Sequence, residues 1–299
     1  MDFTIIITTH NRREDLHQSL LQLQKLDPPA GEILITADGC SDGTDEMLKK
    51  DFSEIKLLVN QPGKGSVASR DRMLREARHR FILSLDDDSY PVELDFFLRA
   101  QRMLQKYPQA GVIHFPQRSE EYTESLECNS FGPSQWTGSY PNSGALYDRD
   151  LYLSLPGFPR FFFHAYEEPD YGIQAIAAGR DVLFFTDSTI RHHWTGIGRN
   201  EGRTHRRHAR NEALSILLRA PFWTIPLLLI YRAFRQFQYA CKRGVDWVIR
   251  EPLWWWAALK LAPTALRQRK PVPWSAYRKW LKLLGQPEPV ESESEKVRK

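Results

Sequence analysis

The chain has 299 residues, 41% of them hydrophobic and 26% charged, an ordinary globular composition that provides for a sizeable core in one large domain or a domain with an appendage. The net charge of +4 conceals an asymmetry, because residues 1–199 carry 21 Lys and Arg against 29 Asp and Glu, whereas residues 200–299 carry 20 against 8. An acidic body with a basic last third suggests that this last third faces something anionic.

Three features argue against a disulfide-bonded, a secreted and a membrane-spanning protein. The cysteines, Cys40, Cys128 and Cys241, are odd in number and far apart, so we expect reduced thiols in a cytoplasmic protein. Residues 1–4 lead directly into an apolar strand without a basic leader, which argues against a secretory signal. The longest apolar stretch, residues 220–230, holds two prolines and is shorter than the ~20 residues that cross a bilayer, so no transmembrane helix is expected.

Strand and helix patterns alternate through the first two thirds of the chain. Helices are expected between most of the strands, among them residues 92–107 and a helix that begins near residue 167 and ends at Gly179. This alternation predicts an α/β fold with a mostly parallel sheet sandwiched by helices. The expected strands are residues 3–9, 32–37, 55–59, 81–85, 112–116, 144–147 and 182–186.

Polar or glycine-rich turns follow four of these strands. They include residues 38–44, residues 61–66 and the run Asp86-Asp87-Asp88. Ligands of open α/β sheets bind outside the carboxyl ends of the strands, where these turns converge. The convergence favours a nucleotide site at this edge of the sheet.

The acidic run after residues 81–85 supports two interpretations. Asp86 and Asp88 share one side of the strand by its period of two, and all-oxygen ligands suit Mg²⁺ or Mn²⁺ that carries substrate phosphates. The other interpretation is a solvated acidic turn that caps the helix after Pro91, because helix N-termini favour Asp.

Five motifs in order give the first ~215 residues a resemblance to the family 2 inverting glycosyltransferases of the GT-A fold. Each motif is weak alone, but their order and spacing are specific. They are Thr9-His10-Asn11-Arg12, Asp38 with Ser41-Asp42-Gly43-Thr44, Gly65 with Ser69-Arg70-Asp71, Leu85-Asp86-Asp87-Asp88, and Glu167-Glu168 with Asp170 after the aromatic run Phe161–Phe163.

The resemblance implies roles in binding a nucleotide-diphosphate-sugar donor. Asp38 would accept a hydrogen bond from the base, and Asp88 would bind the divalent cation, Mn²⁺ or Mg²⁺, that bridges the diphosphate. Asp42 is expected to be a helix cap rather than a ligand, because its surroundings are typical of a turn. The remaining residues implied at the donor are Thr9, Asn11, Arg12, Lys64, Arg70, Asp86 and Asp87, although a solvent-facing Arg on a helix explains Arg70 as well.

An inverting transfer also needs a base that takes the proton of the acceptor hydroxyl. The family usually has Asp at the position that aligns with Glu168, so this chain departs from the pattern. Glu168 is our first choice, Asp170 is the alternative, and Glu167 would orient the acceptor. Acidic residues are also favoured in any first helical turn, which is the structural explanation.

Two histidines and a tryptophan are further candidates. His192 and His193 follow a strand at a place where related enzymes supply a histidine to the metal or the diphosphate, and His192 aligns better. Trp136 lies in the long polar and aromatic loop 118–141 and would border the acceptor site, unless it belongs to the core.

The basic last third is expected to be helical over residues 216–284. Between Arg203 and Lys282 there are 17 Lys and Arg, three acids and seven of the nine tryptophans. Basic residues beside aromatic residues such as Trp223 and the run 254–256 are typical of helices that lie on an anionic membrane. Nucleic acid is disfavoured for lack of a recognised motif, and a packed helical hairpin is the remaining alternative. Residues 285–299 are expected to be disordered.

These patterns predict a metal-dependent inverting glycosyltransferase that acts on a saccharide or lipid-linked saccharide from the inner face of the cell membrane. Its domain would be residues 1–215. A polyprenyl-phosphate glycosyltransferase and a non-catalytic nucleotide-sugar-binding protein docked at a membrane are the alternatives.

Overall fold

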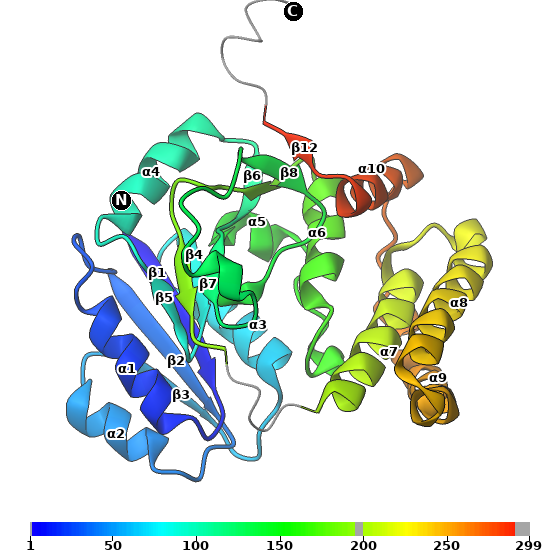
Figure 1. The fold of residues 1–299 in the computed structure, drawn as a ribbon, viewed down its shortest axis with the longest axis horizontal. Helices are drawn as coiled ribbons and strands as arrows, with labels where there is room; N and C mark the ends of the chain where they lie inside the picture. Colours follow the sequence, from blue (N-terminus) through cyan, green and yellow to red (C-terminus); the bar gives the residue numbers. More distant parts are fainter. Residues whose placement is uncertain (1, 195–199, 291–299) are drawn as a thin grey trace, which may run out of the picture.

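A computed structural model describes residues 2–194 and 200–290 (Figure 1). Within these residues, nine strands form one sheet in the order β12-β8-β10-β6-β9-β4-β1-β2-β3, and three form a smaller sheet in the order β5-β11-β7. The strands of the large sheet are β1 (Phe3–Thr9), β2 (Glu32–Asp38), β3 (Lys56–Asn60), β4 (Phe81–Asp86), β6 (Ala110–His114), β8 (Gln135–Thr137), β9 (Ala145–Asp148), β10 (Asp181–Phe184) and β12 (Glu288–Pro289). Those of the small sheet are β5 (Ser89–Pro91), β7 (Gln117–Ser119) and β11 (Ile190–His192).

Helices cover both faces of the large sheet. The first group is α1 (Arg13–Leu23), α2 (Thr44–Asp51) and α4 (Phe96–Lys106), and the second is α3 (Ser66–Glu76), α5 (Arg149–Ser154) and α6 (Glu167–Ala177). Successive side chains of a strand point to opposite faces, so Ile5 and Ile7 pack in the first core while Ile6 packs in the second. All three are fully buried. The expected α/β fold with a sandwiched sheet is confirmed.

The sheet is more mixed than expected. Strands β3, β2, β1 and β4 are parallel, as are β6 and β10. Strand β9 lies antiparallel between β4 and β6, and β8 and β12 continue the sheet in antiparallel fashion at its edge. The antiparallel strands β8 and β9 come from the stretch between β6 and α5, in which no α-helix separates the strands.

One predicted helix begins later than expected. Residues 89–91 remain extended because they pair with β11, and the backbone N–H of Val92 donates to the carbonyl of Thr189. Helix α4 therefore begins at Phe96 rather than at residue 92. This pairing matters for function, because it brings His192 beside the acidic run.

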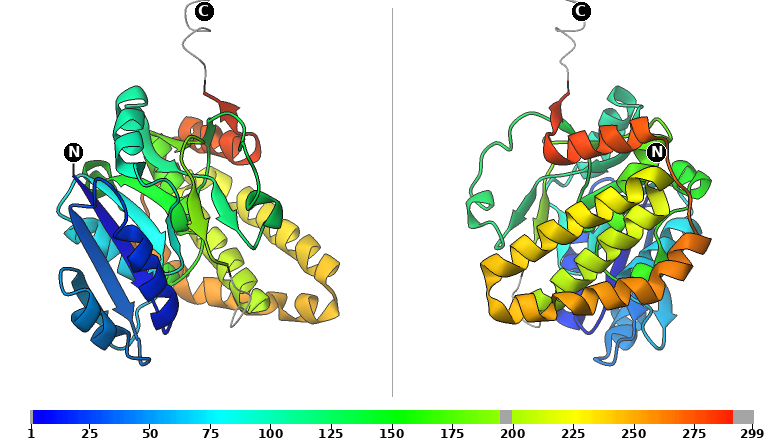
Figure 2. Two further views of the ribbon diagram at one scale, coloured as in Figure 1. Left: turned by 60° about the vertical axis from the view of Figure 1, so that its left-hand side comes forward. Right: turned by 90° about the vertical axis from the view of Figure 1, so that its right-hand side faces the viewer.

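Four further helices form the C-terminal part: α7 (Glu201–Arg219), α8 (Ile225–Arg243), α9 (Val245–Arg267) and α10 (Trp274–Gly285). Figure 2 shows α7, α8 and α9 side by side, with α10 returning toward the sheet. Trp280 of α10 is buried, and its indole N–H donates to the carbonyl of Gly138 at 2.8 Å. Among the residues that the structure describes, no helix combines the length and the apolar character needed to cross a bilayer.

Two expected boundaries change in this part of the molecule. The predicted boundary at residue 215 falls inside α7, whose buried Leu214 and Leu218 pack in the second core of the sheet. The expected disorder from residue 285 is wrong for the start of that segment, because Glu288 and Pro289 pair with β8 at the sheet edge. Residues 291–299 lie outside the described residues.

Candidate active site

The acidic run lies where β4 ends and the small sheet begins. Asp86 is the last residue of β4, and Asp88 directly precedes β5. Because β5 pairs with β11, Ser89 stands opposite His192, and the imidazole comes within 3.2 Å of a carboxylate oxygen of Asp88. Asp86, Asp88 and His192 each place one ligand atom within 4.8 Å of the others.

One ring nitrogen of His192 is held by a neighbouring amide. Its Nδ1 lies 3.1 Å from Oε1 of Gln117, an oxygen that can only accept, so Nδ1 carries the proton. The amide of Gln117 is oriented in turn, because its nitrogen donates to Ser143 at 2.6 Å. Nε2 of His192 therefore faces the carboxylates as a potential ligand. A metal-binding histidine is commonly held in this way.

Arg12 balances part of the negative charge of the cluster. Its Nη1 lies 2.7 Å from Asp88 and 3.0 Å from Asp87. Burial nevertheless raises the pKa of Asp87 to about 7, assisted by the neighbouring carboxylates and opposed by Arg12. Burial has the same effect on Asp88, but His192 and Arg12 outweigh it and hold the pKa of Asp88 below its ordinary value. Two carboxylates and an imidazole at this spacing fit Mn²⁺ or Mg²⁺.

The carboxylate of Asp38 organises the turn after β3. Its Oδ1 accepts from the backbone N–H of Lys64 and from the side chains of Asn60 and Ser69, and its Oδ2 accepts from the backbone N–H of Gly65. Oδ1 thus accepts three hydrogen bonds and Oδ2 only one, so Oδ2 is the oxygen with capacity left for a ligand. Asp38 lines two cavities, of 570 Å³ and 630 Å³.

The 570 Å³ cavity, which we call the polar cavity, brings together most of the residues predicted from sequence. It lies against the acidic run on one side and the start of α6 on the other. Its walls include Thr9, Arg12, Asp38, Arg70, Asp86, Asp87, Glu167 and Glu168, together with Asn142, Tyr166 and His208.

Arg70 joins the two sides of the polar cavity. The guanidinium is buried, pairs with Asp86, and lies 3.7 Å from Glu167 at the first turn of α6. Its pKa is raised above the ordinary value, since the charges of Asp86 and Glu167 outweigh the cost of burial. The alternative of a solvent-facing Arg is therefore wrong. Arg70 places a fixed positive charge between the acidic run and the carboxylates of α6.

Glu167 and Glu168 behave differently within the cavity wall. Glu167 is buried, and its Oε1 accepts from Asn142 at 3.2 Å. Glu168 is partly accessible and lines the cavity. Burial and the charge of Glu167 raise the pKa of Glu168 above its ordinary value. Burial raises the pKa of Glu167 as well, so what distinguishes Glu168 is its greater accessibility to a ligand.

The segment before α6 is strained. Phe163, Ala165 and Tyr166 have φ values of 68°, 72° and 70°, a left-handed conformation that costs a residue with a side chain about 1–3 kcal/mol. Asn211 of α7 holds this segment, since its buried amide donates to the carbonyls of His164 and Ala165 at 2.9 Å and 2.8 Å. Asn211 thereby holds the first turn of α6 in position, although it lies about 45 residues further along the chain.

Asp170 serves this support and does not line the cavity. It is fully buried and accepts from Nε and Nη2 of Arg219, from Ser215 and from Gln174. A carboxylate with this many partners on the side of α6 that faces α7 is not placed to take a proton from a substrate. The geometry favours Glu168 over Asp170 as the base.

Four other predicted residues lie outside both the polar cavity and the cluster of Asp86, Asp88 and His192. His193 is exposed and contacts the hydroxyl of Tyr90 at 3.0 Å, so only His192 of the pair belongs to the cluster. Lys64 is exposed, and Asn11 accepts from the backbone N–H of Ser41 to join two loops. Trp136 packs edge-on against Tyr107 between the cores, which supports the core interpretation of this residue rather than an acceptor wall.

The prediction for Asp42 is consistent with its contacts. Its Oδ1 accepts from the backbone N–H of Thr44 at 3.2 Å, at the start of α2, and its Oδ2 accepts from the backbone N–H of Arg13 at 3.0 Å, at the start of α1. Asp42 therefore satisfies the N-termini of two helices.

Three further residues line the polar cavity although no sequence pattern indicated them: Asn142, Tyr166 and His208. Tyr166 directly precedes the Glu167-Glu168 pair, and this neighbourhood could have indicated that it lies at the site. Asn142 and His208 carry no such signal, because only the folded chain brings the end of the long loop and the helix after residue 200 to this wall.

The chain is similar to known sugar-transferring proteins. The sequence profile described as Glycosyl transferase family 2 matches residues 4–156, just over half of the chain. The Escherichia coli protein WfgD, a UDP-Glc:alpha-D-GlcNAc-diphosphoundecaprenol beta-1,3-glucosyltransferase, is 34% identical over 86 residues, which are 28% of this chain and 34% of WfgD. The chain thus matches about a third of the length of this curated relative.

Solved structures extend the similarity over most of the fold. TarS from S. aureus (residues 1–349) has a TM-score of 0.63 at 18% identity, with 89% of this chain and 81% of that chain covered. The mannosyltransferase PcManGT from Pyrobaculum calidifontis, solved with GDP-Man and Mn²⁺, has a TM-score of 0.57 at 17% identity, with 89% and 83% covered. At these identities the structures establish a shared fold, which confirms the expected GT-A architecture.

Proposed function

Because the chain belongs to glycosyl transferase family 2, we propose that it is a metal-dependent inverting glycosyltransferase that moves a sugar from a nucleotide-diphosphate-sugar donor to a saccharide or lipid-linked saccharide acceptor. One observation supports the proposal. The polar cavity reaches the cation-type cluster through Asp86, which lines one end of the cavity, and Glu168, whose pKa is raised, lines the other end; Arg70 lies between Asp86 and Glu167. A transfer that separates a diphosphate from a sugar needs these two chemistries at opposite ends of one cavity.

The donor would lie along the turns after β1, β2 and β3. Oδ2 of Asp38 has an acceptor position left for the base, while Thr9 and Arg12 border the same cavity. PcManGT and GalNAc-T7 were solved with Mn²⁺ beside GDP-Man or UDP, which supports a divalent cation here. Asp86, Asp88 and His192 would hold that Mn²⁺ or Mg²⁺, which would offset the charge of the leaving diphosphate.

The base of the reaction is Glu168 in this proposal. Its carboxylate takes the proton of the acceptor hydroxyl while the hydroxyl oxygen bonds to the anomeric carbon. The bond from that carbon to the diphosphate oxygen breaks on the opposite side, so the anomeric configuration inverts. Glu167, held by Asn142 and Arg70, keeps the first turn of α6 in place and orients the acceptor.

The C-terminal helices would dock the enzyme peripherally on the inner face of the cell membrane. Trp223, Ile230 and Trp256 are 68%, 69% and 62% exposed, an unusual exposure for large apolar side chains. They lie within the stretch 203–282, where 17 basic residues stand against three acids. Trp254 is not part of this surface, since it is buried and donates to Glu251 at 2.7 Å.

The proposal is tested by measuring thermal stabilisation of the chain by UDP-, GDP-, CMP- and dTDP-linked sugars, with Mn²⁺ and with EDTA. A ligand at 100 times its dissociation constant stabilises the folded state by about 2.7 kcal/mol. We expect one nucleotide class to raise the unfolding temperature in the presence of Mn²⁺, with slow release of the free sugar. No stabilisation by any of the four classes would contradict the proposal.

A further inference from the structure

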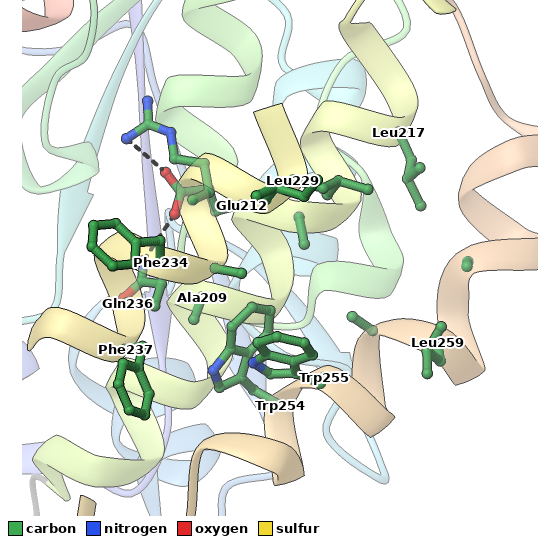
Figure 3. A pocket seen from close by; sticks show the side chains of 16 residues that line it. Ala209, Glu212, Leu217, Leu229, Phe234, Gln236, Phe237, Trp254, Trp255 and Leu259 are labelled. Atoms are coloured by element: carbon green, nitrogen blue, oxygen red, sulfur yellow. Dashed lines mark hydrogen bonds and ion pairs between the residues drawn. The ribbon is translucent and has the colours of Figure 1, made fainter. Parts of the chain in front are cut away.

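The C-terminal helices enclose an apolar groove that the transfer chemistry does not use. It has a volume of 540 Å³, within the range of about 300–1,000 Å³ typical of ligand pockets. Side chains from α8 and α9 form its walls over a floor from α7 (Figure 3). The large apolar side chains that line it are Leu229, Ile230, Phe234, Phe237, Trp255 and Leu259.

The few polar groups of the groove are occupied with one another. Glu212 accepts from Gln236 at 2.8 Å and pairs with Arg232 at 3.3 Å, as the dashed lines in Figure 3 show. The hydroxyl of Tyr166 donates to the same carboxylate at 3.4 Å. An occupant would gain little by competing for these groups, so the groove suits a hydrocarbon chain.

A third pocket shares lining residues with both the groove and the polar cavity. This middle pocket, of 540 Å³, shares His208 with the polar cavity and Gln236 with the groove. Its walls also carry His205 and Arg243, and Arg243 lies 3.5 Å from the exposed carboxylate of Glu201. Three environments therefore adjoin one another: the carboxylates of the polar cavity, the mixed charged and hydrogen-bonding side chains of the middle pocket, and the hydrocarbon of the groove.

We propose that the groove binds the hydrocarbon chain of a prenyl diphosphate lipid that carries the acceptor sugar. The sugar lies in the polar cavity, the diphosphate in the middle pocket beside Arg243, and the chain in the groove. This inference rests on the proposed transferase function and names the acceptor class.

Charge selects this occupant over a second copy of the protein. The stretch 203–282 that forms the groove has 17 basic residues and three acids, so two such surfaces repel each other, whereas a diphosphate is attracted. The groove also opens among exposed apolar side chains, since Ile230 and Leu259 on its walls are 69% and 65% exposed. A chain that leaves the groove thus meets the surface proposed to face the membrane.

Calorimetric titration with farnesyl diphosphate, below its micelle concentration, tests the proposal without any need for turnover. Ala258→Leu and Ala233→Leu narrow the groove from α9 and α8, while Ala257→Leu adds the same volume one residue outside it. We expect wild type and Ala257→Leu to bind within about twofold of each other and both groove variants to bind at least tenfold more weakly. Inorganic diphosphate should bind weakly, and Arg243→Gln should lower the affinity for farnesyl diphosphate but not for farnesol.

Unfolding midpoints of the unliganded variants show whether a loss of affinity for farnesyl diphosphate reflects misfolding. If one groove variant is misfolded, the other, from a separate helix, still tests the proposal. The proposal is wrong if wild type does not bind the probe, or if Ala257→Leu and the groove variants bind alike. Sedimentation that shows a wild-type dimer dissociated by Ala258→Leu would assign the groove to a second copy. Nucleoside diphosphate binding, measured separately, shows whether the proposed function fails instead.

Discussion

The polar cavity and the apolar groove have nearly the same volume, 570 Å³ and 540 Å³, but they are built from opposite chemistry. The polar cavity collects strand ends and the first turn of α6, where charged side chains lie close together and burial changes their pKa values. The groove is built from helix faces whose charges are paired among themselves. The comparison shows how the two cavities suit different tasks. Group transfer needs buried charges that lie close together and have shifted pKa values, whereas binding a hydrocarbon chain needs walls whose charges are already paired.

The largest expected effect follows from the acidic run. Asp88→Asn removes one of the charges that would hold a divalent cation, so metal-dependent binding of a nucleoside diphosphate should be lost. Calorimetry with Mn²⁺ present and absent measures this loss. Asp95→Asn is the control, because Asp95 lies at the start of α4 and pairs there with Arg99. Unchanged metal dependence in Asp88→Asn would remove the cation site from the account.

Glu168→Gln should leave donor affinity near the wild-type value and lower turnover by about 10²–10⁴-fold, as expected for a lost general base. Steady-state rates at saturating donor measure the loss. Asp170→Asn is the informative comparison, since its effect should be on stability through Arg219. If Asp170→Asn gave the selective turnover loss and Glu168→Gln did not, the base would be Asp170.

Arg219→Met separates the ion pairs of the two regions. It leaves the buried carboxylate of Asp170 without its main partner, which should lower the free energy of unfolding by about 3–5 kcal/mol. Arg232→Met affects the partly exposed pair with Glu212 in the groove and should cost less. Denaturant unfolding gives both values. Equal losses would mean that the Arg219–Asp170 pair contributes no more to the free energy of unfolding than the Arg232–Glu212 pair.

The pH dependence of transfer should report the coupled pair Glu167–Glu168. A base acts when deprotonated, and the pKa of Glu168 is raised, so kcat/KM should fall about tenfold per unit as pH drops below that raised pKa. The acid limb should therefore lie well above pH 4.5. Glu167→Gln removes a neighbouring negative charge and should move the limb to lower pH. A profile flat from pH 5 to 8 would exclude Glu168 as the base.

The smallest effect concerns the exposed surface around the groove. Binding to anionic liposomes should weaken as salt rises, because the Debye length falls from about 10 Å at 0.1 M to about 3 Å at 1 M. Co-sedimentation over a salt series measures it, and Trp256→Ser should weaken binding more than a substitution far from this surface, such as Tyr122→Ser. Equal binding to neutral and anionic lipids at all salt concentrations would contradict an electrostatic contribution.

The parts of the site predicted from sequence are those that follow from strand ends. Asp38 and Asp86 end apolar strands, Asp88 lies two residues beyond Asp86, and a parallel sheet brings such ends to one edge. His192 could be placed for a similar reason, but its preference over His193 depends on the pairing of β5 with β11. The local sequence pattern therefore predicts where the acidic cluster lies but not which histidine completes it.

The support of α6 could not be predicted, because it comes from α7. Asn211 and Arg219 stand in a helix whose basic residues suggested a surface role, yet both are buried against the strained segment and Asp170. Trp136 illustrates the same limit, since an aromatic residue in a long loop suits a sugar site and a core equally well. Tertiary contacts over this sequence distance leave no periodic signal.

The anomeric configuration of the first product distinguishes metal-dependent inverting transfer from the other possible reactions. Proton NMR of the donor, Mn²⁺ and wild-type enzyme should show release of a sugar or glycoside whose anomeric configuration is inverted relative to the donor. The signal should be absent with EDTA and slowed in Glu168→Gln. A product that retains the donor configuration, or one that forms equally fast without a divalent cation, would contradict the account.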